Sequence, residues 1–433
     1  MAAPDEPEPA APATELDEAA RAGDDAAARR GVRLFAWVSG AALSLVLLVN
    51  AVVNPTGVFP YELLRPLVNP VRARKVRILA RQQGVHFDNV VLGSSRTMKL
   101  EPAAVSRWLG GETFNAGVNS GRPEDYFVLL SYMLDQGYRP QRVVLGVDVE
   151  AFHNSAPVDS RLLGVAPLAG RLRWQDRAPA WAEGLKESLS ARTFGHSLRA
   201  IRYTLTEYPP AREGTITDHG FEIVRSRDRQ IKRGTYDLQA KIDADRGKYL
   251  DRFAGYTGVS AWRVGYFERF LELCAAHRIT LYVYITPLHP ELVALLRAER
   301  DYDARHAEVL ALLRAYSDSH GFVFKDMSEL SMWGGDPANF YDGAHMRVEN
   351  HRRVMDELLG PALGGVPRGE TPEETARRER AERVKAQRAR AKQQRERRAA
   401  QARAKEDAKE DASARDTNSA REIDGAPARG GEG

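Results

Sequence analysis

Two neighbouring serines occupy a position where a hydroxyl group could act as a nucleophile. The stretch Gly93-Ser94-Ser95-Arg96-Thr97 follows the apolar run NVVL, which is typical of a buried strand, and precedes a segment with helical spacing. A hydroxyl at such a junction lies near free backbone N–H groups, and glycine lets the chain turn tightly enough to expose it. Serine is also an ordinary helix-capping residue, so a structural role stays open for this segment alone.

A base and its orienting carboxylate are available in NFYDGAH, at 339–345. Serine is a weak nucleophile and needs a base within hydrogen-bond reach, and an imidazole base needs a carboxylate on its other nitrogen. Asp342 and His345 supply both groups, and the spacing Asp-x-x-His places them on one loop. The alternative is that Asp342 serves a turn or a cap and that His345 is an exposed side chain.

A third polar segment, FNAGVNSG at 114–121, also follows an apolar stretch. Small residues after a strand leave backbone N–H groups free to converge on a negatively charged oxygen, and Asn119 adds a side-chain amide donor. The segment is therefore a candidate oxyanion-binding element, with a simple turn as the alternative.

Strand and helix patterns alternate around these three segments. Apolar runs predict strands near 89–93, 113–117, 142–149, 279–286 and 321–325, and helical spacing predicts helices near 98–109, 123–136, 261–277, 290–319 and from about 346 onward. Apolar strands separated by helices form parallel sheets that are covered on both faces. We therefore expect an α/β fold with a doubly wound parallel sheet of about five strands, whose carboxyl edge brings the polar segments together.

The alternation is interrupted at 150–258, where Arg-rich, aromatic and turn-rich pieces show no strong period. This stretch predicts a helical insertion or cap. An insertion that leaves the carboxyl end of a strand can shape substrate access, because open α/β proteins bind ligands there. A packing elaboration with a solvated basic surface is the alternative.

The N-terminal region predicts one membrane anchor. Residues 1–33 are rich in Ala, Pro, Asp and Glu and are expected to be disordered and cytoplasmic, whereas 34–53 carry no charge and have the length of a transmembrane helix. A cleaved signal peptide is the alternative, but the segment is longer than a typical h-region and lacks a small-x-small site. Arginines at positions 29, 30 and 33 favour a cytoplasmic N-terminus, although basic residues also follow the helix.

Composition narrows the possible partners. The tail at 365–433 consists largely of Ala, Arg, Lys, Glu, Gln and Asp, and predicts a charged helical or disordered segment that is either solvated or attached to an anionic lipid or polysaccharide. The formal net charge is only +4, so no nucleic-acid partner is expected. The single cysteine, Cys274, excludes an internal disulfide and is expected to be buried, and no residues show metal-ligand spacing, so neither metal nor cofactor is expected.

Together, the motifs resemble the SGNH (GDSL-like) hydrolase superfamily. G-S-S-R, N-A-G-V-N-S-G and D-G-A-H occur in the order that this superfamily shows. The resemblance implies a flavodoxin-like SGNH domain at 54–364, with Ser95 as nucleophile, Ser94 as the runner-up, Asp342 as orienting carboxylate and His345 as general base. With the apolar helix, NPTGVFP and NPVRARKVR, the chain looks like membrane-anchored members, which are related in plan to the D-alanyl-lipoteichoic acid transfer protein and the alginate O-acetylation proteins.

The chain departs from the family's pattern in two places. The glycine that donates its N–H to an oxyanion falls on Ser120 or Gly121, because the spacing here is one residue longer than usual, with Gly121 the preferred match, and the third-block asparagine is replaced by Asp148. An ionised carboxylate would repel an oxyanion, so Asn119 and the Ser95 N–H are expected to act as donors beside Gly121. Three further residues, Arg96, Asp148 and His289, are candidate substrate contacts, although arginines at helix starts are commonly solvated and lone histidines are often structural.

The resemblance implies two-step acyl transfer at the bacterial inner membrane, with the catalytic domain extracytoplasmic. The expected partners are an acyl donor, a glycan or lipid acceptor and a membrane-embedded acyltransferase, and the expected product is an O-acylated exported or cell-surface polysaccharide. A membrane-anchored esterase or deacetylase is the first alternative. A catalytically weak SGNH-like scaffold of an envelope assembly is the second.

Overall fold

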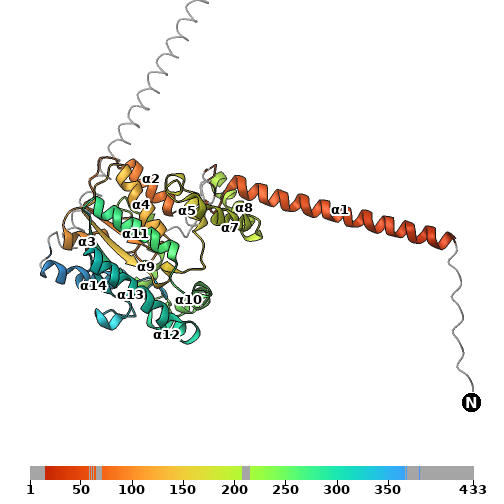
Figure 1. Ribbon diagram of the computed structural model, residues 1–433. Coiled ribbons are helices and arrows are strands. Elements are labelled where there is room, and N and C mark those ends of the chain that lie inside the picture. Colours follow the sequence, from red (N-terminus) through yellow and green to blue (C-terminus); the bar gives the residue numbers. More distant parts are fainter. Residues whose placement is uncertain are drawn as a thin grey trace, which may run out of the picture. The chain divides into compact units, whose positions relative to one another are not determined.

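A five-stranded parallel sheet forms the centre of the protein (Figure 1). The computed structural model describes residues 15–57, 59, 61, 63–64, 71–206, 215–365, 367 and 380. The strands are β1 Asn89–Gly93, β2 Thr113–Asn115, β3 Arg142–Val147, β6 Thr280–Ile285 and β7 Val323–Asp326, in the spatial order β2-β1-β3-β6-β7. The prediction of a parallel α/β sheet of about five strands is confirmed. The strand order reverses between β1 and β3, and the loops at such a switch point form the usual ligand site of an open α/β sheet.

Helices cover both faces of the sheet. Alternate residues of a strand point to opposite faces, and accordingly Val90 and Leu92 belong to one buried hydrophobic cluster while Val91 belongs to another. The first cluster includes side chains of α2 Val71–Arg81, α4 Pro123–Asp135, α11 Ala261–Ala276, α12 Pro290–Glu299 and α13 Tyr302–His320; the second includes α3 Pro102–Leu109 and α14 Val348–Leu359. The sheet is therefore doubly wound, as expected.

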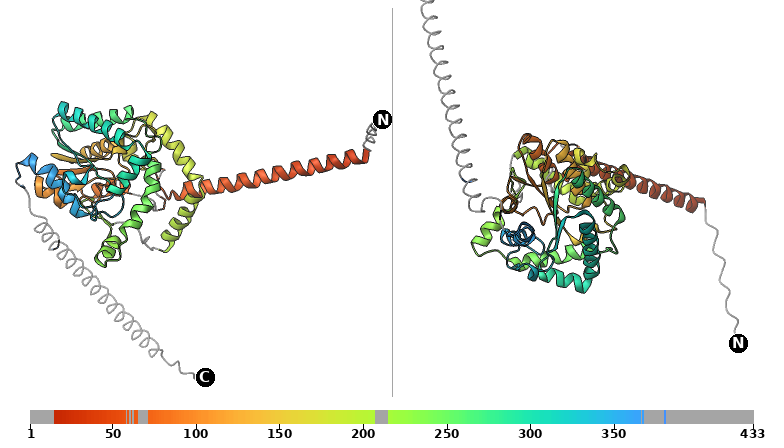
Figure 2. Two further views of the ribbon diagram at one scale, coloured as in Figure 1. Left: turned by 90° about the horizontal axis from the view of Figure 1, so that it is seen from below. Right: turned by 60° about the vertical axis from the view of Figure 1, so that its left-hand side comes forward.

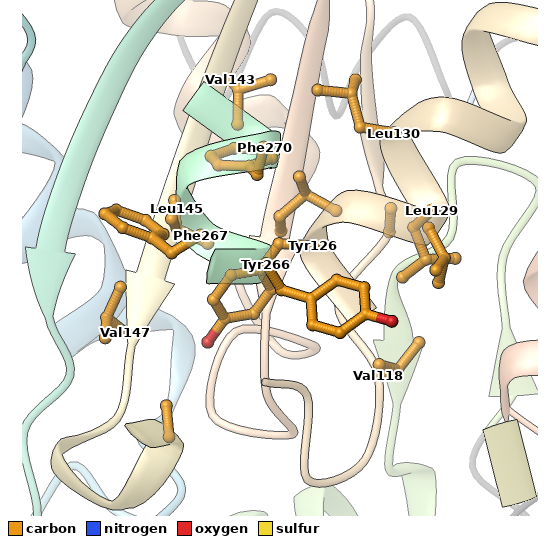
Figure 3. Packing of buried hydrophobic residues seen from close by; sticks show 14 of the residues in the cluster. Val118, Tyr126, Leu129, Leu130, Val143, Leu145, Val147, Tyr266, Phe267 and Phe270 are labelled. Atoms are coloured by element: carbon orange, nitrogen blue, oxygen red, sulfur yellow. The ribbon is translucent and has the colours of Figure 1, made fainter. Parts of the chain in front are cut away.

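Aromatic side chains fill the space between the sheet and the helices α4 and α11. Figure 3 shows Tyr126, Phe267 and Phe270 packed over the β3 residues Val143 and Leu145. The rings of Tyr126 and Phe270 meet edge to face, with centroids 6.3 Å apart. This packing fixes α4, and with it the polar segment that leads into α4, against the sheet.

The predicted insertion at 150–258 is mainly helical. It contains η1 Val149–Phe152, α5 Ser160–Leu163, α6 Ala166–Ala169, α7 Trp174–Ser188, α8 Ala191–Thr206, α9 Arg225–Lys232 and α10 Leu238–Phe253, with a small antiparallel pair β4 Thr215–Ile216 and β5 Glu222–Ile223. The short helices η2 Leu330–Met332 and η3 Pro361–Leu363 lie in the C-terminal part of the domain.

Two predicted elements differ from the structure. The single helix expected at 290–319 is wrong, because Arg300 is extended (φ −146°, ψ 162°) and Asp301 begins a second helix. The disordered segment expected at 1–33 is wrong in part, because α1 Glu15–Val53 already begins in this Ala-rich stretch of strong helix formers. Residues 1–14, and the charged tail expected at 365–433 apart from 365, 367 and 380, lie outside the described residues.

Helix α1 contains an apolar segment, Ala28–Val53, that is long enough to cross a membrane as an anchor or to act as a signal sequence. Its large side chains are not packed in a core, since Leu34 is 66% exposed, Phe35 74% and Trp37 79%. Figure 2 shows the helix extending from the domain. An apolar surface of this extent needs a partner other than water.

Replacing Gly146 by alanine is expected to destabilise the domain, because the new Cβ would lie 2.4 Å from the Thr97 methyl group and 3.0 Å from the Tyr284 ring. We expect the free energy of unfolding to fall by about 1–3 kcal/mol, as in other overpacked cores. Gly265→Ala is the matched control: no atom lies within 4 Å of its Cβ, and stability should be equal or higher. Urea unfolding of the full chain in mild detergent measures both, and an unchanged G146A variant would contradict this account.

Candidate active site

A glycine turn at the end of β1 sets the position of Ser95. Gly93 has φ 139°, and a Cβ there would lie 2.5 Å from the carbonyl oxygen of Gly146, so no larger residue fits. The turn is closed by Ser94, whose carbonyl oxygen accepts hydrogen bonds from the Thr97 N–H (3.0 Å) and hydroxyl (2.8 Å). The Ser94 hydroxyl is buried and accepts the Arg96 N–H (3.1 Å), whereas Ser95 is half-buried.

Ser95, His345 and Asp342 form a continuous relay of hydrogen bonds. The Ser95 Oγ lies 2.9 Å from His345 Nε2, and His345 Nδ1 lies 2.7 Å from Asp342 Oδ1. With the proton on Nδ1, the imidazole donates to the carboxylate and accepts from the serine hydroxyl, which is the arrangement a general base requires. The structure thus brings the three predicted residues together from positions 250 residues apart in sequence.

Hydrogen bonds within the loop at 339–345 hold the side chain of Asp342 and the backbone of His345 in place. Asp342 Oδ1 accepts the backbone N–H groups of Ala344 (3.2 Å) and His345 (2.9 Å), and the Tyr341 N–H donates to the carbonyl oxygen of His345 (2.7 Å). Asp342 is therefore a turn residue as well as the partner of the imidazole. Its contacts are compatible with both interpretations left open for it from sequence.

Residues of the insertion at 150–258 also form hydrogen bonds with this loop. Arg227 of α9 donates from Nη1 to Asp342 Oδ2 (2.8 Å), and Asp245 of α10 accepts the Gly343 N–H (3.2 Å). The Tyr341 hydroxyl donates to Asp228 (2.6 Å). Sequence reasoning missed Arg227, because nothing in RSRDRQIKR distinguishes the arginine that reaches the loop from those that stay in solvent.

The charges around Asp342 keep it ionised. Burial raises the pKa of Asp342, but the charge and hydrogen bond of His345, followed by the charge of Arg227, more than offset burial and hold this pKa well below its usual range. Asp342 thus remains an acceptor for the imidazole at any physiological pH.

The segment after β2 lies against the nucleophile turn. The Val118 N–H donates to the carbonyl oxygen of Gly93 (3.1 Å), and a Cβ on Gly117 would lie 3.3 Å from the carbonyl oxygen of Ser94. The N–H of Gly121, expected as an oxyanion donor, instead donates to Val118 (3.1 Å). The N–H groups of Ser95, Asn119 and Ser120 make no hydrogen bond to any residue that the structure describes, so all three are available as donors in this region.

Arg96 and Asp148 belong to a buried ion-pair network. Asp148 Oδ1 accepts the Thr286 hydroxyl (2.6 Å) and lies 3.4 Å from Arg96 Nη1, while Arg96 Nη2 donates to Glu150 (2.5 Å). Burial raises the pKa of Asp148, and the Arg96 charge opposes this rise. Arg96 and Asp148, both candidate substrate contacts from sequence, are only 2% and 3% exposed, and their side chains bond to other buried groups.

His289 supports the catalytic loop through its backbone. Its N–H donates to the carbonyl oxygen of Gly343 (2.9 Å), and its ring packs edge to face on Phe340. The ring also caps α12, since Nδ1 accepts the Glu291 N–H (3.4 Å). The side chain is 6% exposed, which fits the structural alternative rather than a substrate contact.

Comparisons with known proteins give little further information. No family model matches the chain, and no curated protein matches it. Among solved structures, a protein of Bacteroides fragilis described as a "putative acylhydrolase" matches with a TM-score of 0.32 and 13% sequence identity, over 67% of this chain and 95% of that one. At this identity and TM-score, the likeness says nothing about the reaction.

Replacing Arg227 by glutamine is expected to slow the reaction of Ser95 with a fluorophosphonate by about tenfold at an unchanged melting temperature. A hydrogen bond to a charged group contributes about 1.5–3 kcal/mol, and less where the guanidinium is partly exposed, as Arg227 is. Arg229→Gln, on the exposed side of the same helix, serves as the control. Equal labelling rates for both variants would show that Arg227 does not help to position Asp342.

Replacing Asp148 by asparagine is expected to lower the free energy of unfolding by about 1–3 kcal/mol, because Arg96 loses one of its two buried charge partners. Asp135→Asn breaks an exposed pair with Arg171 and should change stability by less than about 0.5 kcal/mol. Urea unfolding gives both values. A D148N protein of normal stability that reacts faster with the fluorophosphonate would show instead that the carboxylate opposes the oxyanion.

Proposed function

We propose that the chain is a membrane-anchored serine acyl-transfer enzyme of the SGNH type that O-acylates an exported or cell-surface polysaccharide. The hydrogen-bond relay from Ser95 through His345 to Asp342 is the observation that carries the proposal. The order of the motifs and the parallel sheet with spatial order β2-β1-β3-β6-β7 support it.

The first step forms an acyl-enzyme. Ser95 Oγ attacks the carbonyl carbon of an ester or thioester while its proton moves to His345 Nε2, and the carbonyl oxygen becomes negatively charged. The N–H groups of Ser95 and Asn119 stabilise that oxygen. The tetrahedral intermediate then expels the alcohol or thiol, which takes the proton from His345, and the acyl group stays on Ser95 as an ester.

The second step passes the acyl group to an acceptor hydroxyl. His345 removes the proton from that hydroxyl, its oxygen attacks the acyl-Ser95 carbonyl, and the proton returns to Ser95 when the ester breaks. Asp342 stabilises the imidazolium in both steps and does not itself take the proton. Water in place of the sugar hydroxyl would make the enzyme an esterase or deacetylase.

The surface beside the catalytic loop favours a polar acceptor. A cavity of about 310 Å³ is lined by Lys99, Glu101, Phe221, Glu222, Ile223, Val224, Asp228, Ile231, Lys232, Tyr341, Arg347, Val348 and Glu349. More than half of these residues are charged, and Tyr341 directly precedes Asp342. Mixed charges and two aromatic rings suit hydroxyl-rich sugars, whereas a long acyl chain needs an apolar groove.

The proposed location follows from α1. An anchor in the bacterial inner membrane, with the arginines before the apolar segment on the cytoplasmic side, places the domain outside the cytoplasm. A polysaccharide acceptor is available there, and a membrane-embedded acyltransferase would supply the acyl donor across the bilayer. The membrane thus brings donor and acceptor to one surface.

Fluorophosphonate labelling of the purified full chain tests the activated serine. Wild type is expected to label, whereas Ser95→Ala and His345→Ala are expected to lose at least about 99% of the labelling rate, as removal of a triad member does in general. Ser94→Ala is the matched control and should keep labelling, because its hydroxyl is committed to the turn.

The outcomes separate three functions. Failure of the folded wild type to label would favour the scaffold. If labelling occurs, p-nitrophenyl acetate assays with and without purified envelope polysaccharide distinguish the other two: acetylated glycan identified by mass spectrometry supports transfer, and acetate release unaffected by glycan supports an esterase.

A further inference from the structure

A second, basic pocket shares no lining residue with the cavity described above. It has a volume of about 790 Å³ and is lined by Ser120, Arg122, Ala156, Pro157, Val158, Asp159, Ser160, Arg161, Lys186, Glu187, Ser190, Arg192, Thr193 and His196. Neither the sequence motifs nor the proposed reaction uses these residues, apart from the position of Ser120 in the turn after β2.

The positive charge of the basic pocket exceeds its negative charge. Its lining has four cationic residues, Arg122, Arg161, Lys186 and Arg192, and two anionic residues, Asp159 and Glu187. Asp159 is saturated: it accepts the N–H and guanidinium of Arg161 and pairs with the buried Arg72 (3.3 Å). The pocket is thus suited to a ligand that brings its own negative charge.

One edge of the basic pocket is fixed to the end of the apolar helix. Asn50, near the C-terminal end of α1, donates to the carbonyl oxygen of Ser188 (2.7 Å) and accepts the hydroxyl of Ser197 (2.7 Å). Ser188 ends α7 and Ser197 lies within α8; the connection between the two helices contributes Ser190 to the lining, and the first turn of α8 contributes Arg192. The pocket therefore lies beside the level at which α1 leaves the bilayer.

Aromatic side chains lie close to the same end of α1. The rings of Phe59 and Tyr61 stack with centroids 5.7 Å apart, Phe59 lies 6.0 Å from Trp181 of α7, and the Tyr61 hydroxyl donates to the carbonyl oxygen of Ala51 (2.6 Å). Tryptophan and tyrosine concentrate at the headgroup region of membranes. Their contacts with α7 and with the end of α1 agree with a basic pocket at the membrane surface.

We infer that the basic pocket binds the phosphate headgroup of an anionic phospholipid. Guanidinium groups recognise phosphate oxygens with paired hydrogen bonds, and basic residues at a bilayer surface attract anionic lipids. His196 lies beside these cationic groups in the lining of the pocket. The inference rests on the proposed membrane anchoring of α1 and is independent of the acyl-transfer reaction.

Calorimetric titration of the full chain in a nonionic detergent tests the inference. The ligands are dihexanoyl phosphatidylglycerol, dihexanoyl phosphatidylcholine and inorganic phosphate. Phosphatidylglycerol is expected to bind, with Arg192→Glu weakening the affinity at least about tenfold. Arg202→Glu, an equal charge reversal on α8 outside the lining, should bind as wild type does.

The arms of the titration separate the possible sources of phosphate. Binding of inorganic phosphate with no binding of the lipid would overturn the headgroup assignment, and so would equal binding of the two lipids or an equal loss in R192E and R202E. Ser95→Ala should retain lipid binding in full. A wild-type protein that binds the lipid but does not label with fluorophosphonate would therefore disprove the proposed reaction and leave the headgroup site standing.

Discussion

The close approach of β1 and β3 at their carboxyl ends determines the geometry of the candidate active site. Gly93 and Gly146 are register partners, and the side chain of Thr97 fills the space that two Cβ atoms would otherwise occupy. This packing lets the chain turn immediately after β1 and projects Ser95 from the edge of the sheet. The segment after β2 then packs on the same turn, so the nucleophile and its nearest free N–H groups share one rigid support.

His345 and Asp342 reach this support through a different kind of contact. Their loop lies outside the sheet and is held by polar interactions from several elements, including His289 before α12 and Arg227, Asp228 and Asp245 of the insertion. The insertion therefore helps to hold the loop that carries Asp342 and His345 in place. A change in the position of α9 would alter the base without moving the nucleophile.

The sheet and the relay of Ser95, His345 and Asp342 could be predicted from the sequence, whereas the contacts that surround the relay could not. Short apolar runs ending in polar residues predict strand ends well, and Ser95 follows such a run, whereas Asp342 and His345 are marked by the spacing Asp-x-x-His before the last helix. The pairing of Asp148 with Arg96 and the contact of Arg227 with Asp342 connect residues far apart in the chain, and no local pattern marks them. Gly121 was expected as a donor from the resemblance of its segment to the family's motif, but its N–H donates to the carbonyl oxygen of Val118 instead.

The hydrogen bonds of Asn50 have a mechanical consequence. An asparagine that bonds to both α7 and α8 joins the end of α1 to the insertion at this point. In a bilayer, such a joint would set the height of the catalytic serine above the lipid and limit its sideways reach, unlike a domain carried on a flexible tether. With the proposed function, the protein would then select among acceptors by their distance from the membrane as well as by their chemistry, and polymer segments emerging at the surface would be modified before those that have already diffused away.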